Sequence, residues 1–357
     1  MHIPDGYLSP QTCAVLGAAM VPVWLTAGRK VRKVVKSRYV PLVAIGAAFS
    51  FLVMMFNLPI PDGTTAHGVG ATLIAILLGP WAAAIAVSIA LLIQALFFGD
   101  GGVLAFGANA FNMAFVMPFV GYGVYRLLTR GSELTSPRRA IGAGVAAYVG
   151  INAGAFVAAV EIGLQPDLFA RPDGTPLYAP FHLAQSIPAM LFAHLTIAGL
   201  VEAAISFGVL AYLQRANLPV LRINHAGAEG ELGTAAAPRR LGWRWAFAGL
   251  GAMALLTPLG LLAPGGAFGE DAPADLDLGR YGLQAVPAGL ERWSSFWSHT
   301  VLGGYGFASG DHPVVGYLLS AVLGIVISGG LIIGLFALVR LVARRTGGRS
   351  GVTGSTT

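Results

Sequence analysis

The sequence is short of charged residues, and this shortage is the first guide to its class. Only 11% of its 357 residues are Asp, Glu, Lys or Arg, whereas soluble domains carry about 25%. Hydrophobic residues make up 55% of the chain, and its mean hydropathy is +0.71. Apolar stretches of about 20 residues recur, which is the length that crosses a bilayer as a helix. The composition therefore predicts a polytopic membrane protein.

Cysteine and the common catalytic motifs are also scarce. The one cysteine, Cys13, excludes an internal disulfide and a CxxC metal site. The chain has no G-x-x-x-x-G-K-[ST] loop, no H-E-x-x-H motif, no nucleophile elbow and no paired catalytic carboxylates. We therefore expect no enzyme activity, and an ATP-driven role would need an ATPase on another chain. The start has neither a basic nor an apolar leader region. Because the bulky His2 disfavours removal of the initiator methionine, the mature chain is expected to begin at Met1.

The apolar stretches predict an all-α helical bundle with about seven spans in an N-terminal part and two in a C-terminal part. The stretches are 8–27, 40–57, 68–97, 105–125, 140–162, 181–214, 243–262 and 314–341. Gly79-Pro80 interrupts the third of them, which is either one kinked helix or a helical hairpin. Residues 181–214 would be about 50 Å long as one helix. We expect the part up to Pro188 to lie at the membrane interface and the remainder to span.

The positions of the basic residues favour the hairpin. With a hairpin and the N-terminus outside, 19 of the 22 Lys and Arg fall in cytoplasmic segments, as the positive-inside rule requires. The exceptions are Arg171, Arg280 and Arg292. The formal charge of +6 therefore needs no nucleic-acid partner. His2 and His67 then share the outer side of the membrane.

The segment Met1 to Gly6 carries the most informative chemistry. His2 lies beside the terminal amine, so amine, backbone and imidazole nitrogens can chelate one ion. Nitrogen ligands in a planar set suit nickel or copper, and imidazole also suits cobalt. Pro4 prevents the start from continuing as helix, and Asp5-Gly6 completes a turn. The alternative is a terminal histidine that binds no metal.

His67 follows a turn-rich loop and directly precedes the apolar run that begins at residue 68. Its imidazole would supply a fourth nitrogen ligand. Taken alone, it is better explained as an ordinary interfacial histidine. Its place on the same side of the membrane as His2 favours a shared site.

Other ionisable residues are weaker candidates. His182 and His194 are 12 residues apart, without i, i+4 spacing, and His194 inside an apolar span is at least as well explained as a hydrogen-bonded bundle histidine. Glu161 is interpreted as interfacial. Glu202 is expected to pair within the bundle, and the candidate partners are Thr196, Asn109 and Asn112. His299 and His312 are expected to be exposed in an outer loop.

Five motifs, in order, resemble the CbiM/NikM family of substrate-binding membrane subunits of energy-coupling-factor transporters for cobalt and nickel. They are residues 1–10 (MHIPDGYLSP), 57–67 (NLPIPDGTTAH), 77–81 (LLGPW), 98–102 (FGDGG) and 107–113 (GANAFNM). The resemblance implies that the Met1 amine, the His2 amide and imidazole, and the His67 imidazole hold the metal. Ala66 departs from the glycine common in the family, which affects loop flexibility and removes no ligand.

The C-terminal part resembles the fused NikN/CbiN-like extension, also called PDGLE-type, through residues 258–270 (PLGLLAPGGAFGE) and 287–291 (PAGLE). Ala288 stands where that motif has aspartate. The expected organisation is a metal-capturing domain at 1–215, a cytoplasmic linker at 216–242, a two-span domain at 243–345 with an outer loop at 263–313, and a disordered tail at 346–357.

The resemblance implies that the chain captures Co²⁺ or Ni²⁺ outside the cell membrane. A transmembrane coupling subunit and ATP-binding subunits, CbiQ/CbiO-like or NikQ/NikO-like, would then drive uptake. No cofactor beyond the transported ion is expected. The alternatives are a stand-alone divalent-metal channel or carrier and a membrane metalloenzyme. The absence of a ladder of intramembrane carboxylates argues against proton coupling in a carrier.

Overall fold

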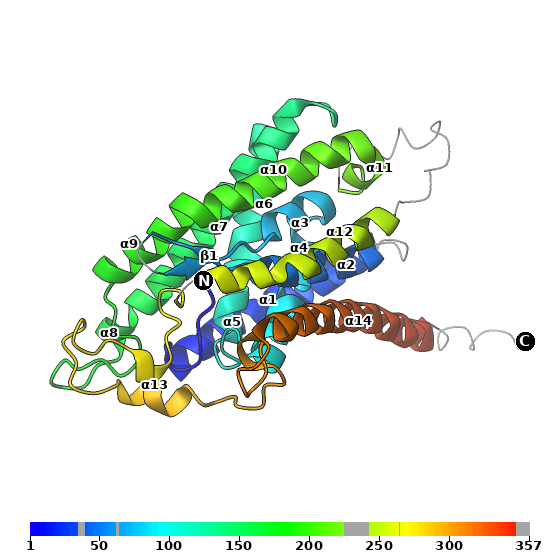
Figure 1. Ribbon diagram of the computed structural model, residues 1–357. Helices are drawn as coiled ribbons and strands as arrows, with labels where there is room; N and C mark the ends of the chain where they lie inside the picture. Colours follow the sequence, from blue (N-terminus) through cyan, green and yellow to red (C-terminus); the bar gives the residue numbers. More distant parts are fainter. Residues whose placement is uncertain (35–39, 62–63, 225–242, 264, 348–357) are drawn as a thin grey trace, which may run out of the picture.

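The computed structural model describes residues 1–34, 40–61, 64–224, 243–263 and 265–347 (Figure 1). The predicted linker from residue 225 onward, the predicted tail from residue 348 onward, Asp62-Gly63 and part of the first basic segment lie outside the described residues. Within them the chain is mostly helical, which confirms the all-α prediction, and the strands form one two-stranded sheet.

The helices of residues 1–224 follow one another through short connections. They are α1 Pro10–Val34, α2 Val40–Met54, α3 Ala71–Leu78, α4 Pro80–Ile93, α5 Phe106–Asn109, α6 Met117–Leu128, α7 Pro137–Gly163, α8 Gln165–Leu168, α9 Leu183–Ala193, α10 Gly199–Ala216 and α11 Leu218–Leu221. Three π-helical segments, η2 Gln94–Phe98, η3 Ala110–Val116 and η4 His194–Ala198, continue α4, join α5 to α6 and join α9 to α10. Strands β1 Leu58–Pro59 and β2 Thr65–Ala66 pair antiparallel.

Residues 243–347, here called the C-terminal segment, contain α12 Trp243–Leu256, α13 Ala288–Trp293 and α14 Pro313–Gly347. Three short 3₁₀ helices lie between them, at Thr257–Leu262, Pro273–Asp275 and Gly303–Tyr305.

Among the residues that the structure describes, five helical stretches are long and apolar enough to cross a membrane. They are Pro10–Val31, Pro80–Phe98, Pro137–Leu168, Leu183–Ala216 and Pro313–Leu338, and Val40–Met54 and Ala246–Leu262 are shorter apolar helices. The eight-residue α3 is about 12 Å long at 1.5 Å per residue, so it does not cross a bilayer core of about 30 Å by itself. The count of nine spans and the outward N-terminus stay predictions.

The chain forms a helical hairpin at Gly79-Pro80. This was predicted from the positions of the basic residues. Gly79 has φ 91° and ψ 152°, a conformation that glycine adopts without a steric penalty. Helix α3 packs against α4. His67, before α3, and Asp100, after α4, both contact His2, so the chain must reverse between them.

Pro188 does not break the helix in which it lies, and the interfacial position of the residues before it stays a prediction. Residues 183–216 form one helical run, and Pro188 lies inside α9. A proline removes one backbone hydrogen bond from a helix, and the packing of α9 against α7 retains the helical path despite that loss.

The C-terminal segment shares its core with the rest of the bundle. Helix α14 packs against α2 and α4, and α12 packs against α2 (Figure 1). The contact with α2 is close at Gly324, because a Cβ added there would meet the ring of the fully buried Phe51. Small residues of this kind let membrane helices approach one another.

We predict that Gly324→Ala destabilises the protein by about 1–3 kcal/mol, because its methyl group overpacks the contact with Phe51. Gly334→Ala on the same helix is the matched control, since a Cβ there meets no atom within 4 Å. Thermal unfolding of both variants in detergent measures the difference. Equal melting temperatures would show that α14 does not pack on α2 in this way.

Candidate metal site at the N-terminus

The first three residues lie inside the bundle and are held there by backbone contacts. Met1, His2 and Ile3 are each no more than 1% exposed. The Ile3 amide donates to Asn109 Oδ1 at 2.8 Å, and Asn109 Nδ2 donates back to the Ile3 carbonyl at 3.0 Å. The Gly102 amide also donates to that carbonyl at 2.9 Å. The position of the chain start is therefore fixed by both the loop and the helix that follow α4.

The turn that follows is anchored in the same loop. The two carboxylate oxygens of Asp5 accept hydrogen bonds from the amides of Val103 and Ala105 at 3.1 and 3.0 Å. The sequence predicted a turn here, and the structure adds that Asp5 joins it to the start of α5.

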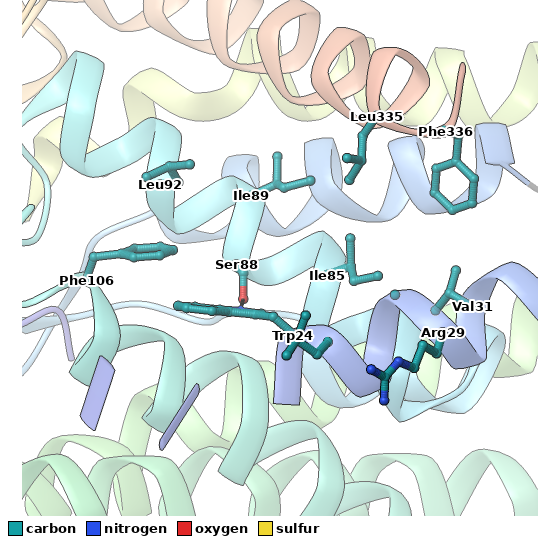
Figure 2. A pocket seen from close by; sticks show the side chains of 12 residues that line it. Trp24, Arg29, Val31, Ile85, Ser88, Ile89, Leu92, Phe106, Leu335 and Phe336 are labelled. Atoms are coloured by element: carbon teal, nitrogen blue, oxygen red, sulfur yellow. Dashed lines mark hydrogen bonds between the residues drawn. The ribbon is translucent and has the colours of Figure 1, made fainter. Parts of the chain in front are cut away.

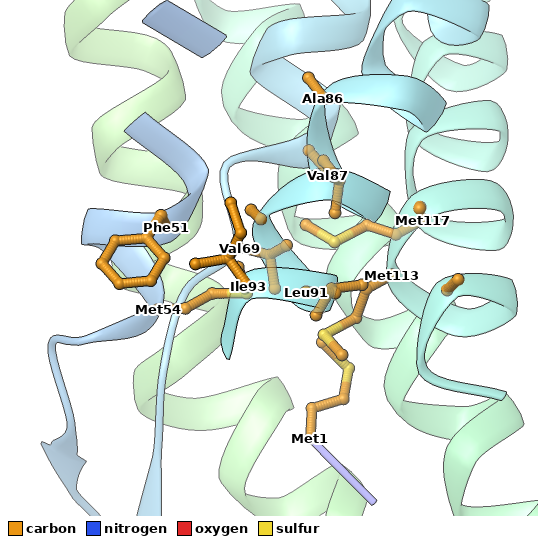
Figure 3. Close-up of a cluster of buried hydrophobic side chains, with 14 of the residues drawn as sticks. Met1, Phe51, Met54, Val69, Ala86, Val87, Leu91, Ile93, Met113 and Met117 are labelled. Atoms are coloured by element: carbon orange, nitrogen blue, oxygen red, sulfur yellow. The ribbon is translucent and has the colours of Figure 1, made fainter. Parts of the chain in front are cut away.

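The side chain of Met1 points into the apolar core. Figure 3 shows it beside Met113, beneath Leu91 and Met117. Burial of this side chain keeps the amine nitrogen of Met1 from moving into solvent, and that nitrogen makes a 2.9 Å ion pair with Glu270 Oε1 of the C-terminal segment.

His2 and His67 meet through their ring nitrogens. His2 Nδ1 lies 3.1 Å from His67 Nε2, and the ring centroids are 4.7 Å apart. His67 Nδ1 lies 2.9 Å from the Gly68 carbonyl. Because a carbonyl only accepts, Nδ1 carries the hydrogen, and Nε2 presents its lone pair to His2.

Both imidazoles are held neutral, which is the form that binds a metal. Burial lowers the pKa of His2 to about 4, with the Glu270 carboxylate opposing this effect and the Met1 amine adding to it. Burial also sets the pKa of His67 well below its usual value, and the Met1 amine and the His2 ring act in the same direction.

Asp100 forms the other side of the cluster. Its Oδ1 lies 3.0 Å from His2 Nδ1, and the Tyr305 hydroxyl donates to its Oδ2. Gln94 Nε2 donates to the Tyr305 oxygen at 2.8 Å and to Asp100 Oδ2 at 3.3 Å. Burial raises the pKa of Asp100 to about 6, against the effects of the Tyr305 hydrogen bond and the amine.

The loop that carries His67 is positioned from two sides. Strand β2 ends at Ala66, directly before His67, and its pairing with β1 fixes its direction. After His67, the Glu202 carboxylate accepts from the amides of Val69 and Gly70 at 2.8 and 2.9 Å. The predicted pairing of Glu202 with Thr196, Asn109 or Asn112 is therefore wrong, because the backbone turn before α3 offers two unpaired amides to one carboxylate.

The remaining candidates lie outside the cluster. Glu161 is buried near the end of α7, and Asn112 Nδ2 donates to its Oε2 at 2.7 Å; its interpretation as interfacial stays a prediction. His194 is buried, and its Nδ1 lies 2.7 Å from the Met190 carbonyl. His182 precedes α9 in an exposed position, 3.2 Å from Asp167. His299 and His312 are exposed, as expected.

Sequence reasoning missed Glu270, Asp100 and Tyr305. Asp100 and Glu270 each lie in a glycine-containing motif. Such a motif predicts a turn, but it does not predict which side chain of the turn reaches the site. Tyr305 lies in a long loop with no motif that points to the N-terminus. Their approach depends on contacts more than 90 residues apart in the chain.

A separate cavity of about 520 Å³ lies between α1, α4 and α14 (Figure 2). Its lining is mostly apolar and includes Trp24, whose Nε1 donates to Ser88 Oγ at 2.9 Å. No histidine or carboxylate lines it, so it offers no cation ligands.

An apolar helical bundle with a buried cluster of amine, imidazole and carboxylate groups defines an integral membrane protein with a candidate cation site. The chain belongs to the CbiM family, because the family model described as the cobalt uptake substrate-specific transmembrane region matches residues 2–219. This is a family of cobalt and nickel transport membrane proteins.

Two curated relatives match nearly the whole chain. A fused nickel transport protein NikMN of Rhodobacter capsulatus is 48% identical and covers 97% of this chain and 100% of its own length. A probable fused nickel transport protein LarMN of Lactiplantibacillus plantarum is 45% identical, covering 92% of this chain and 95% of its own. A crystal structure of a truncated transition metal transporter is 60% identical with a TM-score of 0.56, covering 60% of this chain and 98% of that one. The resemblance to the family and to its fused form is confirmed.

We predict that Glu202→Gln loosens the loop after His67, because the amide nitrogen would face one of the two backbone N–H groups. The expected loss is about 1–3 kcal/mol for the buried donor left unpaired. Thermal unfolding and faster hydrogen exchange at Val69 and Gly70 measure it. The exposed Glu291→Gln is the control, and identical exchange in both variants would contradict this role.

Proposed function

We propose that this chain captures Ni²⁺ or Co²⁺ through the Met1 amine, the His2 amide and imidazole, and the His67 imidazole. The observation that carries the proposal is the 3.1 Å approach of His2 Nδ1 to His67 Nε2 beside the terminal amine, in a buried position. Two ring nitrogens that face each other need a proton or a metal ion between them to avoid lone-pair repulsion. The lowered pKa values of both rings keep the imidazoles neutral, which is the form that binds a metal.

The nitrogen ligands of the proposed site also support a first-row transition metal as the bound ion. Amine, amide and imidazole nitrogens from residues 1 and 2 are close along the chain, and such nitrogen ligands suit nickel, copper and cobalt. The two relatives that match nearly the full chain are named for nickel, which favours Ni²⁺ as the cargo. Competition between Ni²⁺ and Co²⁺ at the purified protein tests this preference.

The chain's role is that of a membrane subunit that works with others. It has no phosphate-binding loop, and its relatives are named as transport proteins. A transmembrane coupling subunit and ATP-binding subunits in the cell membrane would supply the energy, with the N-terminus facing outward. The placement of 19 of 22 basic residues supports this orientation. A membrane metalloenzyme is disfavoured because the sequence has no H-E-x-x-H motif, nucleophile elbow or paired catalytic carboxylates.

We predict that His67→Ala and His2→Ala each weaken Ni²⁺ binding at least about 100-fold, which exceeds the roughly 10–100-fold effect of losing an outer hydrogen-bonding partner. Titration calorimetry on the full chain measures the affinity. The exposed His299→Ala is the matched control.

One residue added before Met1 should also abolish binding, because it converts the amine into an amide and has no space in the buried site. If both histidine variants retain wild-type affinity, the site is elsewhere. If only the extended chain binds normally, the amine is not a ligand.

We predict that vesicles containing this chain alone do not accumulate ⁶³Ni²⁺, whereas vesicles that also contain the coupling and ATP-binding subunits accumulate it when ATP is supplied. A catalytically inactive ATPase is the control. Concentrative uptake by the chain alone would support the carrier alternative instead.

A further inference from the structure

Glu270 reaches the candidate metal site from the far end of the sequence. Its Oε1 lies 2.9 Å from the Met1 nitrogen, although 269 residues separate them in the chain. Its side chain is 21% exposed, and the Met1 partner is fully buried. The carboxylate therefore lies at the boundary between the cluster and solvent.

The segment around Glu270 is bound to the strand that carries His67. The Thr65 amide of β2 donates to the Gly266 carbonyl at 3.2 Å, and Thr65 forms a bridge with Ala267. The Glu270 amide then donates to the Ala267 carbonyl at 3.0 Å, closing a turn in which Gly269 has φ +75°. Glu270 and His67 are thus positioned by the same short strand.

The same segment also contacts the start of the chain. The Tyr7 hydroxyl donates to the Asp271 carbonyl at 2.9 Å. The ring of Phe268 packs on Phe181, with centroids 4.7 Å apart. These contacts fix the backbone on both sides of Glu270, so its approach to Met1 does not depend on one ion pair.

The distances around Glu270 fit coordination of one ion. One ligand atom from each of His2, His67 and Glu270 lies within 4.8 Å of the others. Ligand atoms about 2.0–2.2 Å from a first-row ion are at most about 4.4 Å apart. A carboxylate oxygen above the plane of the nitrogens would lie about 3 Å from each of them, so the widest of these separations closes by up to about 2 Å when the ion binds.

Glu270 and the other nearby carboxylate, Asp100, differ in their hydrogen-bond partners. Asp100 already accepts from Tyr305 and Gln94. Among the described residues, the Glu270 carboxylate has one partner, the Met1 amine. When that nitrogen bonds an ion, it gives up one proton and its own positive charge, so Glu270 keeps only a neutral N–H partner beside a new divalent charge. A buried or half-buried carboxylate in that position is stabilised by binding the cation.

We propose that Glu270 is an oxygen ligand that the C-terminal segment adds to the nitrogen ligands, so that this segment completes and covers the capture site. The inference rests on the proposed function. A planar nitrogen set leaves positions above and below its plane, and a carboxylate entering from the solvent side can fill one of them.

The alternative is that Glu270 only holds the Met1 ammonium, and the two roles predict opposite effects. As a ligand, Glu270 strengthens ion binding, so its loss weakens affinity. As a partner of the ammonium alone, it competes with the ion for the amine, so its loss leaves affinity unchanged or increases it.

The test measures Ni²⁺ binding to the full chain by titration calorimetry for wild type, Glu270→Gln and Glu270→Ala. We expect both variants to bind about 10–100-fold more weakly and to release Ni²⁺ faster on addition of a chelator. X-ray absorption at the nickel edge should show one nitrogen or oxygen neighbour fewer in Glu270→Ala than in wild type. Asp271→Asn is the charge-matched control, because it removes an adjacent carboxylate that is exposed, and it should retain affinity within about twofold.

Unchanged or tighter Ni²⁺ binding by Glu270→Ala, or equal neighbour counts in the two spectra, overturns the proposal. A wild-type nickel spectrum with four nitrogen or oxygen neighbours, and no fifth, overturns it even if the variants fail to fold. Failure of the proposed function is distinguishable, because then the wild type does not bind Ni²⁺ or the His67→Ala variant binds as the wild type does.

Discussion

Burial of the chain's first three residues inside the helical bundle is the constraint on which the candidate site depends. The two-way hydrogen bonds between Ile3 and Asn109 fix the backbone, and the Met1 side chain occupies the apolar core. A terminal amine on a free chain would have to lose its conformational freedom each time an ion bound. Here folding has already ordered the amine, so under the proposed function the cost of arranging it is met before an ion binds.

The charged groups of the cluster are paired with residues from distant parts of the sequence. The imidazoles of His2 and His67 are neutral, the Met1 amine is paired with Glu270, and Asp100 is hydrogen-bonded to Tyr305. Buried charges persist when they are paired and hydrogen-bonded. Two of these partners, Glu270 and Tyr305, belong to the C-terminal segment. That segment therefore contributes to the chemical environment of the N-terminus as well as to helix packing.

Sequence alone predicted the helical class, the hairpin at Gly79 and the proximity of His2 to His67. Hydropathy and the distribution of basic residues report which side of the membrane a loop occupies, and that was enough to bring those two residues together. The sequence pattern did not predict which hydrogen-bond donors contact a given carboxylate. Glu202 binds backbone amides, and amides have no sequence signature. Glu270 and Tyr305 approach the site through tertiary contacts that no local spacing encodes. Pro188 lies inside a continuous helix, because packing against α7 outweighs one lost hydrogen bond and has no signature in the sequence.

The fusion of both segments in one chain has a physical consequence for these contacts. The strand bridge at Thr65, the Tyr7 hydrogen bond and the Glu270 ion pair are few and small. Between separate molecules, such contacts would have to offset the loss of translational and rotational freedom on association. Packing of α12 and α14 against α2 holds the C-terminal segment beside the bundle, and covalent linkage makes its loop an intramolecular partner with a high effective concentration. The loop is thereby held beside the N-terminus although each of its own contacts is small.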